Sequence, residues 1–235
     1  SDLKVGEFTP VEMASTEREN LKNQVMEMIF GEVDTGAPRI VAKRDSLDQQ
    51  PACFRLDDVT LRGERPWPLL ESVSFDIRRG EILGIAGIDG NGQKELAEVI
   101  AGQRKLDSGE VFLDDEPVSS LSVAARQKRG IRYVTDDRHG EGTVGELSIS
   151  LNTVLKRVGQ RPFWRRSRVR NSLIREFATN LVREHDVRTP NGEVPIANLS
   201  GGNVQKVVVG RELALEPRVV VYNKPTYGLD AKTIK

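Results

Sequence analysis

Apolar and polar positions along the chain predict short strands interleaved with helices. Alternation over 54–61 and 73–77 predicts two strands that each bury one face. Two short apolar runs, 81–86 and 219–222, predict strands buried on both faces of a parallel sheet. Apolar spacing also predicts strands over 111–113 and 131–134 and helices over 96–101, 122–129, 172–184 and 207–215. Strands that alternate with helices imply an α/β fold.

The first 52 residues read differently. Thr16 and Glu19 form a capping box, and the apolar spacing after it predicts one helix that ends near Gly31. Residues 34–50 are polar and contain Gly36 and Pro38, which is typical of a linker. The helix is either a packing appendage or the tail of a preceding domain.

Composition narrows the classes of function. The 235 residues carry 35 Lys+Arg and 35 Asp+Glu, and this balance argues against a dedicated polyanion binder. No apolar run approaches the roughly 20 residues that a membrane-spanning helix needs. The single cysteine, Cys53, excludes a disulfide within this sequence, and two distant histidines, His139 and His185, do not suggest a zinc centre.

The run 87–95, GIDGNGQKE, has the composition of a phosphate-binding loop between a strand and a helix. Glycines let backbone N–H groups converge on an anion, and a helix N-terminus adds the positive end of its dipole. The pattern G-x-x-x-x-G-K-[ST] is met at Gly87 and Gly92, but Gln93 takes the lysine position and Lys94 the Ser/Thr position. A glycine turn without chemical role is the alternative, and Glu95 breaks the dinucleotide pattern G-x-G-x-x-G. The candidate nucleotide-binding residues are Gly87, Asp89, Gly90, Asn91, Gly92, Gln93, Lys94 and Glu95.

Two further motifs follow. LSGGNVQK at 199–206 precedes a predicted helix, with Ser200 as a plausible N-cap and two glycines that free the backbone. The apolar run 219–222 leads into NKPTYGLD at 223–230. Each motif alone is a weak signal, but the three in this order are specific.

This combination resembles the ATP-binding cassette (ABC) proteins over residues 53–235. LSGGNVQK is similar to their signature motif, with Leu199, Ser200, Gly201, Gly202 and Asn203 as its residues, and GIAGIDGNGQKEL resembles the Walker A motif of a second cassette in tandem importer ATPases. YVTDDRHGEG resembles the Q-loop segment, which puts Asp136 at the glutamine position. The resemblance implies a P-loop nucleotide-hydrolase core, mainly a parallel sheet with flanking helices, plus antiparallel β strands and a helical subdomain at about 148–198.

The same resemblance predicts the domain organisation. It makes residues 1–33 the tail of a preceding cassette, 34–52 a linker, and 53–235 a nucleotide-binding domain that is incomplete at its C-terminus. Gly228, Leu229 and Asp230 resemble the D-loop, and no switch histidine follows them. His139 and His185 are expected at the surface, and Trp67 is either the adenine-stacking residue or a loop anchor.

The sequence departs from the family at the Walker B motif. Asn223 and Lys224 stand where the family has the magnesium-binding aspartate and the catalytic glutamate. Lysine is normally protonated at neutral pH and is a poor base. No catalytic or metal-ligating residue is therefore assigned to this chain, and its own site is expected to be weak or inactive.

The resemblance implies an ATP-hydrolysing translocase for sugars or nucleosides, with ATP as cofactor and Mg²⁺ at the partner's site. The partners are the first cassette of the same subunit or a second copy, membrane permease subunits and, indirectly, a solute-binding lipoprotein, which places the chain peripherally on the cytoplasmic face of the membrane. The arginine-rich run 163–170 is either a solvated helix face or a contact with protein, lipid headgroups or nucleic acid, and the resemblance favours protein or headgroups over nucleic acid. A soluble nucleic-acid protein and a catalytically silent regulatory cassette are the alternative functions.

Overall fold

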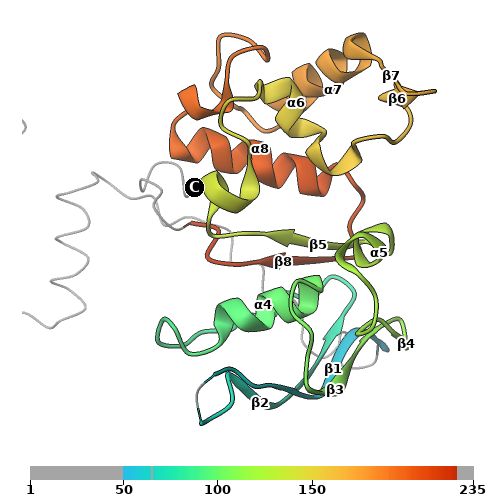
Figure 1. The fold of residues 1–235 in the computed structure, drawn as a ribbon, viewed down its shortest axis with the longest axis vertical. Helices are drawn as coiled ribbons and strands as arrows, with labels where there is room; N and C mark the ends of the chain where they lie inside the picture. Colours follow the sequence, from blue (N-terminus) through green and yellow to red (C-terminus); the bar gives the residue numbers. More distant parts are fainter. Residues whose placement is uncertain (1–49, 65, 227–235) are drawn as a thin grey trace, which may run out of the picture. The chain divides into compact units, whose positions relative to one another are not determined.

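The computed structural model describes residues 50–64 and 66–226, which belong to one compact unit. One sheet in it is antiparallel, with strand order β2-β1-β3-β4 (Figure 1). Its strands are β1 (Ala52–Leu61), β2 (Leu70–Arg78), β3 (Ser108–Leu113) and β4 (Glu116–Pro117). Alternate residues of β1 face the core, and Phe54 and Leu56 are almost fully buried. The strands predicted at 54–61 and 73–77 from alternating apolar positions are thus confirmed.

A second, parallel sheet consists of β5 (Ile131–Val134) and β8 (Val219–Tyr222), with Ile131 opposite Val219 and Val134 opposite Tyr222. All four residues of β5 are buried. Helix α4 (Gln93–Ala101) lies on one face of this pair and α8 (Gly201–Leu213) on the other, as Figure 1 shows. The α/β class and the predicted strands at 131–134 and 219–222 are confirmed, but β8 is only partly buried and not buried on both faces as predicted, with Tyr222 44% exposed.

Helix α4 also covers the antiparallel sheet. Leu96, Val99 and Ile100 pack into one core with β1 and β3, while Ala97 and Ala101 contact Tyr133 of β5. Both sides of this short helix are therefore held by strands, which fixes the loop that precedes it.

The predicted strand at 81–86 is wrong. These residues form no strand in the described part of the chain, and Ile82 is 95% exposed and Ile85 52% exposed. An apolar run becomes a strand only where a neighbouring strand forms hydrogen bonds with its backbone. Strand β8 pairs with β5 along one edge, and residues 81–86 do not pair with its other edge. Among the described residues the parallel sheet therefore has two strands, β5 and β8.

Residues 148–198 contain short helices and a small hairpin. The helices are α6 (Ile149–Thr153), η2 (Leu155–Arg157), α7 (Asn171–Glu184) and η3 (Ile196–Asn198), and the hairpin pairs β6 (Trp164–Arg165) with β7 (Arg168–Val169). Helices α6, α7 and α8 contact one another. The hairpin excludes the solvated helix face, one of the alternatives left open for the arginine-rich run 163–170, because Arg166 and Ser167 adopt left-handed turn conformations.

The remaining elements connect these parts. They are α5 (Val123–Lys128), between β4 and β5, and the π-helix η1 (Arg138–Gly142), after β5. The predicted helices at 96–101, 122–129 and 172–184 and the strand at 111–113 are confirmed within a few residues, and the helix predicted at 207–215 exists but begins six residues earlier, at Gly201. No helix among the described residues is long and apolar enough to cross a membrane. The helix predicted before Gly31, the linker up to residue 49, and the D-loop residues Gly228, Leu229 and Asp230 lie outside the described residues.

Candidate functional site

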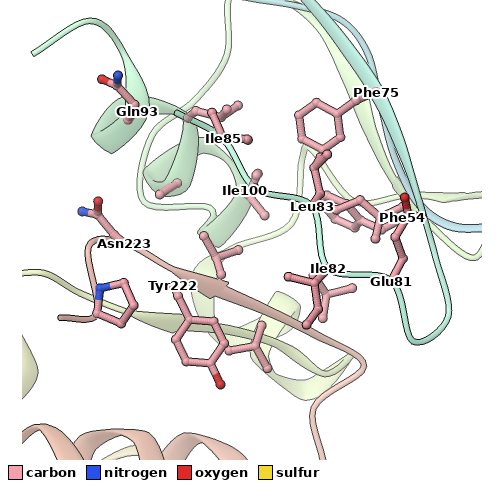
Figure 2. Close-up of a pocket in the computed structure, with 18 of the residues that line it drawn as sticks. Phe54, Phe75, Glu81, Ile82, Leu83, Ile85, Gln93, Ile100, Tyr222 and Asn223 are labelled. Carbon is pink, nitrogen blue, oxygen red and sulfur yellow. The ribbon is translucent and has the colours of Figure 1, made fainter. Parts of the chain in front are cut away.

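A cavity of about 890 Å³ lies between β1 and β2 on one side and β8 on the other, with the extended segment 81–87 along it. Figure 2 shows Phe54 and Phe75 at one end and Gln93 and Asn223 at the other. Asp89 and Lys224 also line it. The cavity is therefore mostly apolar. Its polar groups come from the glycine loop 87–95, from the residues that follow β8, and from Arg78, Arg79, Glu81 and Arg218.

The backbone of the glycine loop turns into α4 at glycines. Gly90 and Gly92 have φ angles of 84° and 96°, in the left-handed region. A Cβ on Gly92 would lie 2.7 Å from the carbonyl oxygen of Leu69, so that only glycine fits. Helix α4 begins at Gln93 and has no side-chain cap at its N-terminus. Its first turn is thus open to an anion.

Gln93 folds back over the loop. Its Nε2 donates to the carbonyl oxygen of Ile88 at 3.0 Å, and its Oε1 accepts from the N–H of Asn91 at 3.2 Å. A Cβ at Gly87 would approach Nε2 to 2.4 Å, so Gly87 gives the amide its space. The glutamine at the lysine position therefore bonds to the loop itself.

Lys94 points elsewhere. Its Nζ contacts Glu141 of η1 at 3.2 Å and Glu98 at 3.9 Å. The hydrogen bond to Glu141 raises the pKa of Lys94 above its ordinary value. This lysine links α4 to η1, and the structure does not bring it to the loop's backbone.

The cation next to the loop is Lys224. Its Nζ lies 2.5 Å from Oδ1 of Asp89, across 135 positions of sequence. The ion pair holds the pKa of Asp89 below its usual range. Lys224 has a φ of 44°, a strained backbone for a residue with a side chain, at the end of β8. Two motifs that are remote in sequence thus meet through opposite charges.

Asn223 connects the ends of the two parallel strands. Its Nδ2 donates to Oδ1 of Asp136 at 2.8 Å and to the hydroxyl of Tyr133 at 3.4 Å. Thr135 donates from Oγ1 to Glu141 at 2.7 Å. Sequence reasoning placed Asp136 here but gave no role to Tyr133 and Glu141, although both lie in the same run YVTDDRHGEG, because the run does not show which side chains the fold brings together.

The segment 199–203 forms a separate surface. Ser200 is the N-cap residue of α8, but its Oγ accepts from Nδ2 of Asn203 at 2.9 Å and makes no cap bond to the backbone. Oδ1 of Asn203 accepts from the N–H of Arg188 at 2.8 Å. A Cβ on Gly201 would meet the Arg138 guanidinium at 2.7 Å. No residue of 199–203 lines the cavity, so one copy of the chain does not bring the two glycine motifs into one pocket.

The other candidates lie outside the cavity. Trp67 is 61% exposed in the loop between β1 and β2. His139 is exposed, as expected, whereas His185 is only half-buried and packs beside Gly210 of α8. In the arginine-rich hairpin Phe163 is buried beside Phe177, with the Arg157 guanidinium 4.5 Å above its ring, and the arginines of the hairpin are exposed.

Comparison with known proteins gives one family. Residues 70–227 match the ABC transporter family. The guanosine import ATP-binding protein NupO of Bacillus subtilis is 35% identical over 195 residues, which cover 82% of this chain and 38% of that protein. The ribose import ATP-binding protein RbsA of Geobacillus kaustophilus is 34% identical over 177 residues, 75% of this chain and 34% of that protein. The chain thus spans little more than a third of the length of these relatives.

Solved structures agree in fold. A nucleotide-free ATP-binding cassette from an ABC transporter superposes with a TM-score of 0.66 at 20% identity, covering 78% of this chain and 73% of that one. The dimeric cassette MJ0796, in a post-hydrolysis state bound to ADP and Pi, superposes with a TM-score of 0.64 at 25% identity and covers 77% of each chain.

Proposed function

Because this chain belongs to the ABC transporter family, we propose that it is the degenerate nucleotide-binding domain of an importer for nucleosides or sugars. In this proposal residues 199–203 complete the ATP site of a partner cassette. The printed functions of NupO and RbsA, guanosine and ribose import, support the solute class. The dimeric state of the related cassette supports pairing with a second cassette.

The observation that carries the proposal is the surface at the start of α8. Ser200 is exposed, Gly201 and Gly202 add no side chains, and the 13-residue helix directs its N-terminus at this point. Backbone N–H groups and the positive end of a helix dipole stabilise phosphate charge. The bonds of Asn203 to Ser200 and Arg188 hold the turn in place. The segment is thus preformed for an anion that another protein surface presents.

The chain's own loop fits nucleotide phosphates better than it fits magnesium. Glycine turns and the uncapped α4 suit phosphate oxygens. Magnesium needs oxygen ligands in near-octahedral geometry, but the Asn223 amide turns its donor nitrogen toward Asp136. Among the described residues no group of three His, Cys, Asp or Glu side chains is placed to hold a metal ion. Magnesium, when bound, supplies charge neutralisation between phosphates, and these residues do not support it here.

Catalysis by this chain would lack a base. Lys224 occupies the position of the catalytic glutamate, and its ammonium is engaged by Asp89. We therefore assign ATP hydrolysis to the partner cassette's site, with magnesium bound there. Permease subunits, a solute-binding lipoprotein, a peripheral position on the cytoplasmic membrane face, and the role of residues 1–33 as the tail of a preceding cassette belong to the same proposal.

The test uses a two-cassette assembly that contains this chain. Ser200→Arg is expected to abolish solute-stimulated ATPase, because the guanidinium fills the space for the partner's phosphates. Gln93→Ala is expected to leave most of that ATPase. Ser172→Arg, at an exposed serine of α7, is the control for an added arginine. Full ATPase in the Ser200 variant together with its loss in the Gln93 variant contradicts the proposal. An assembly that binds ATP but never hydrolyses it favours a silent regulatory cassette instead.

A further inference from the structure

Two lysines matter at the glycine loop, Lys94 within it and Lys224 beyond β8, and Lys224 is the one whose ammonium contacts Asp89 of the loop. Gln93, at the lysine position, is uncharged and bonds to Ile88 and Asn91. Lys94 contacts Glu141 and Glu98. Lys224 reaches the loop at Asp89 and lines the same cavity as Gln93. A positive charge at the loop is thus supplied from the end of β8 and not from the motif's lysine position, which Gln93 occupies.

Two donors at this site, the Lys224 ammonium and the Asn91 N–H, are occupied by oxygen atoms of the protein itself. The Asp89 carboxylate contacts the Lys224 ammonium, and the Gln93 amide oxygen accepts from the Asn91 N–H. Carboxylate and amide oxygens compete with phosphate oxygens for the same donors. Asp89 is 77% exposed, so its side chain has room to swing into solvent when another anion takes its place.

The backbone conformation of Lys224 indicates that the fold fixes the position of this side chain. Its φ of 44° is held at the end of a strand whose neighbour, Asn223, is 5% exposed and hydrogen-bonded to β5 and to Asp136. Strained conformations persist where the surroundings fix them, and they gather at functional sites. A lysine so placed contributes a point charge on a flexible stem, which suits phosphate.

We propose that Lys224 is the phosphate-binding cation of this chain's own nucleotide site, that the site holds the nucleotide without a divalent metal, and that Asp89 competes with the nucleotide for that lysine. The inference rests on the proposed function, since it takes the ligand to be ATP. It adds that the lysine at the position of the catalytic base has taken over the charge that Gln93 no longer supplies.

The experiment measures ATP binding to this full chain by isothermal titration calorimetry, once in EDTA and once with excess Mg²⁺. The two affinities are expected to agree within about threefold. Lys224→Gln is expected to weaken binding about tenfold in EDTA, and Lys224→Arg to retain it within about threefold. Asp89→Asn is expected to strengthen binding by about threefold or more, because it frees the lysine and removes a negative charge. Lys105→Ala, at an exposed lysine, is the control, and circular dichroism verifies folding of each variant.

The directions of the affinity changes in Asp89→Asn and Lys224→Gln distinguish the proposal from an ion pair with a purely structural role. If the pair only held the loop in shape, Asp89→Asn and Lys224→Gln would both weaken binding, and that result overturns the proposal. So does ATP binding that appears only with Mg²⁺, or an unchanged affinity in Lys224→Gln. Absence of ATP binding in the unaltered chain overturns it as well, but leaves the role of Ser200 standing, since the partner cassette's ATPase measures that role separately.

Discussion

Nδ2 of Asn223 donates a 2.8 Å hydrogen bond to Oδ1 of Asp136, and so joins the residue after β8 to the second residue after β5. The two strands are parallel neighbours, with Val134 opposite Tyr222. Their carboxyl ends therefore meet beside the cavity, and a donor nitrogen lies where two facing carboxylates would repel each other without a metal.

Asn223→Asp should convert this contact into a carboxylate pair. Without metal the like charges are expected to lower Tm by about 3 °C. Added Mg²⁺ is expected to restore it, because oxygen ligands then face a cation. Differential scanning calorimetry with and without Mg²⁺ checks this. Asn198→Asp, at an exposed asparagine of η3, should show neither effect. A Tm that changes neither with the substitution nor with added Mg²⁺ would show that the Asn223–Asp136 hydrogen bond does not contribute to stability.

Glu212 of α8 balances two cations inside the protein. Its buried Oε1 accepts from Nζ of Lys156 at 2.8 Å and from Nε of Arg211 at 3.1 Å. Burial lowers the pKa of Lys156, so this lysine needs its counter-charge. Glu212→Gln is expected to cost about 3 kcal/mol in the free energy of unfolding, because it leaves the two cations unbalanced. Urea unfolding measures it, and Glu184→Gln on the exposed end of α7 is expected to change it little. Equal stability in both variants would contradict the internal ion cluster.

Arg126 closes the C-terminal end of α4. Its guanidinium, 1% exposed, donates to the carbonyl oxygens of Val99 and Ile100 at 2.6 and 2.9 Å and to that of Ser119 at 2.8 Å. Lysine cannot reproduce this planar set of donors. Arg126→Lys is therefore expected to lower the free energy of unfolding by about 2 kcal/mol, measured by urea denaturation. The exposed Arg129→Lys serves as the matched change, and a loss of the same size there would refute the capping role.

Tyr133 makes the free energy of unfolding depend on pH in the alkaline range. Burial of its hydroxyl raises its pKa above the ordinary 10.0. The folded state favours the neutral phenol, so its contribution is fully present below pH 10.0 and is lost as the pH rises through the folded-state pKa. Urea unfolding at about pH 8 and about pH 11 is expected to show a smaller loss of stability in Tyr133→Phe than in the unaltered chain. Identical losses in the two proteins would show that Tyr133 does not titrate differently on folding.

Local pattern accounts well for the elements whose faces are set by near neighbours. The alternation around Phe54 and Leu56 predicted β1, and the helical spacing around Leu181 predicted α7. The motif positions Gly87, Gly92 and Ser200 were also evident from local pattern, whereas the position of Asn223 followed from the family resemblance. The arginine-rich hairpin was missed, because its turn depends on left-handed conformations at Arg166 and Ser167 that no glycine announces.

The sequence by itself determined the α/β class, the order of the glycine motifs and the absence of acidic residues at positions 223 and 224, because these follow from residue type and short-range spacing. Only the tertiary structure decided that the backbone of residues 81–86 pairs with no strand, that Lys94 forms an ion pair with Glu141, and that Lys224 forms one with Asp89 across 135 positions. Strand pairing and ion pairs depend on which distant segments the packed core brings within reach, and the local order of residues does not encode that distance.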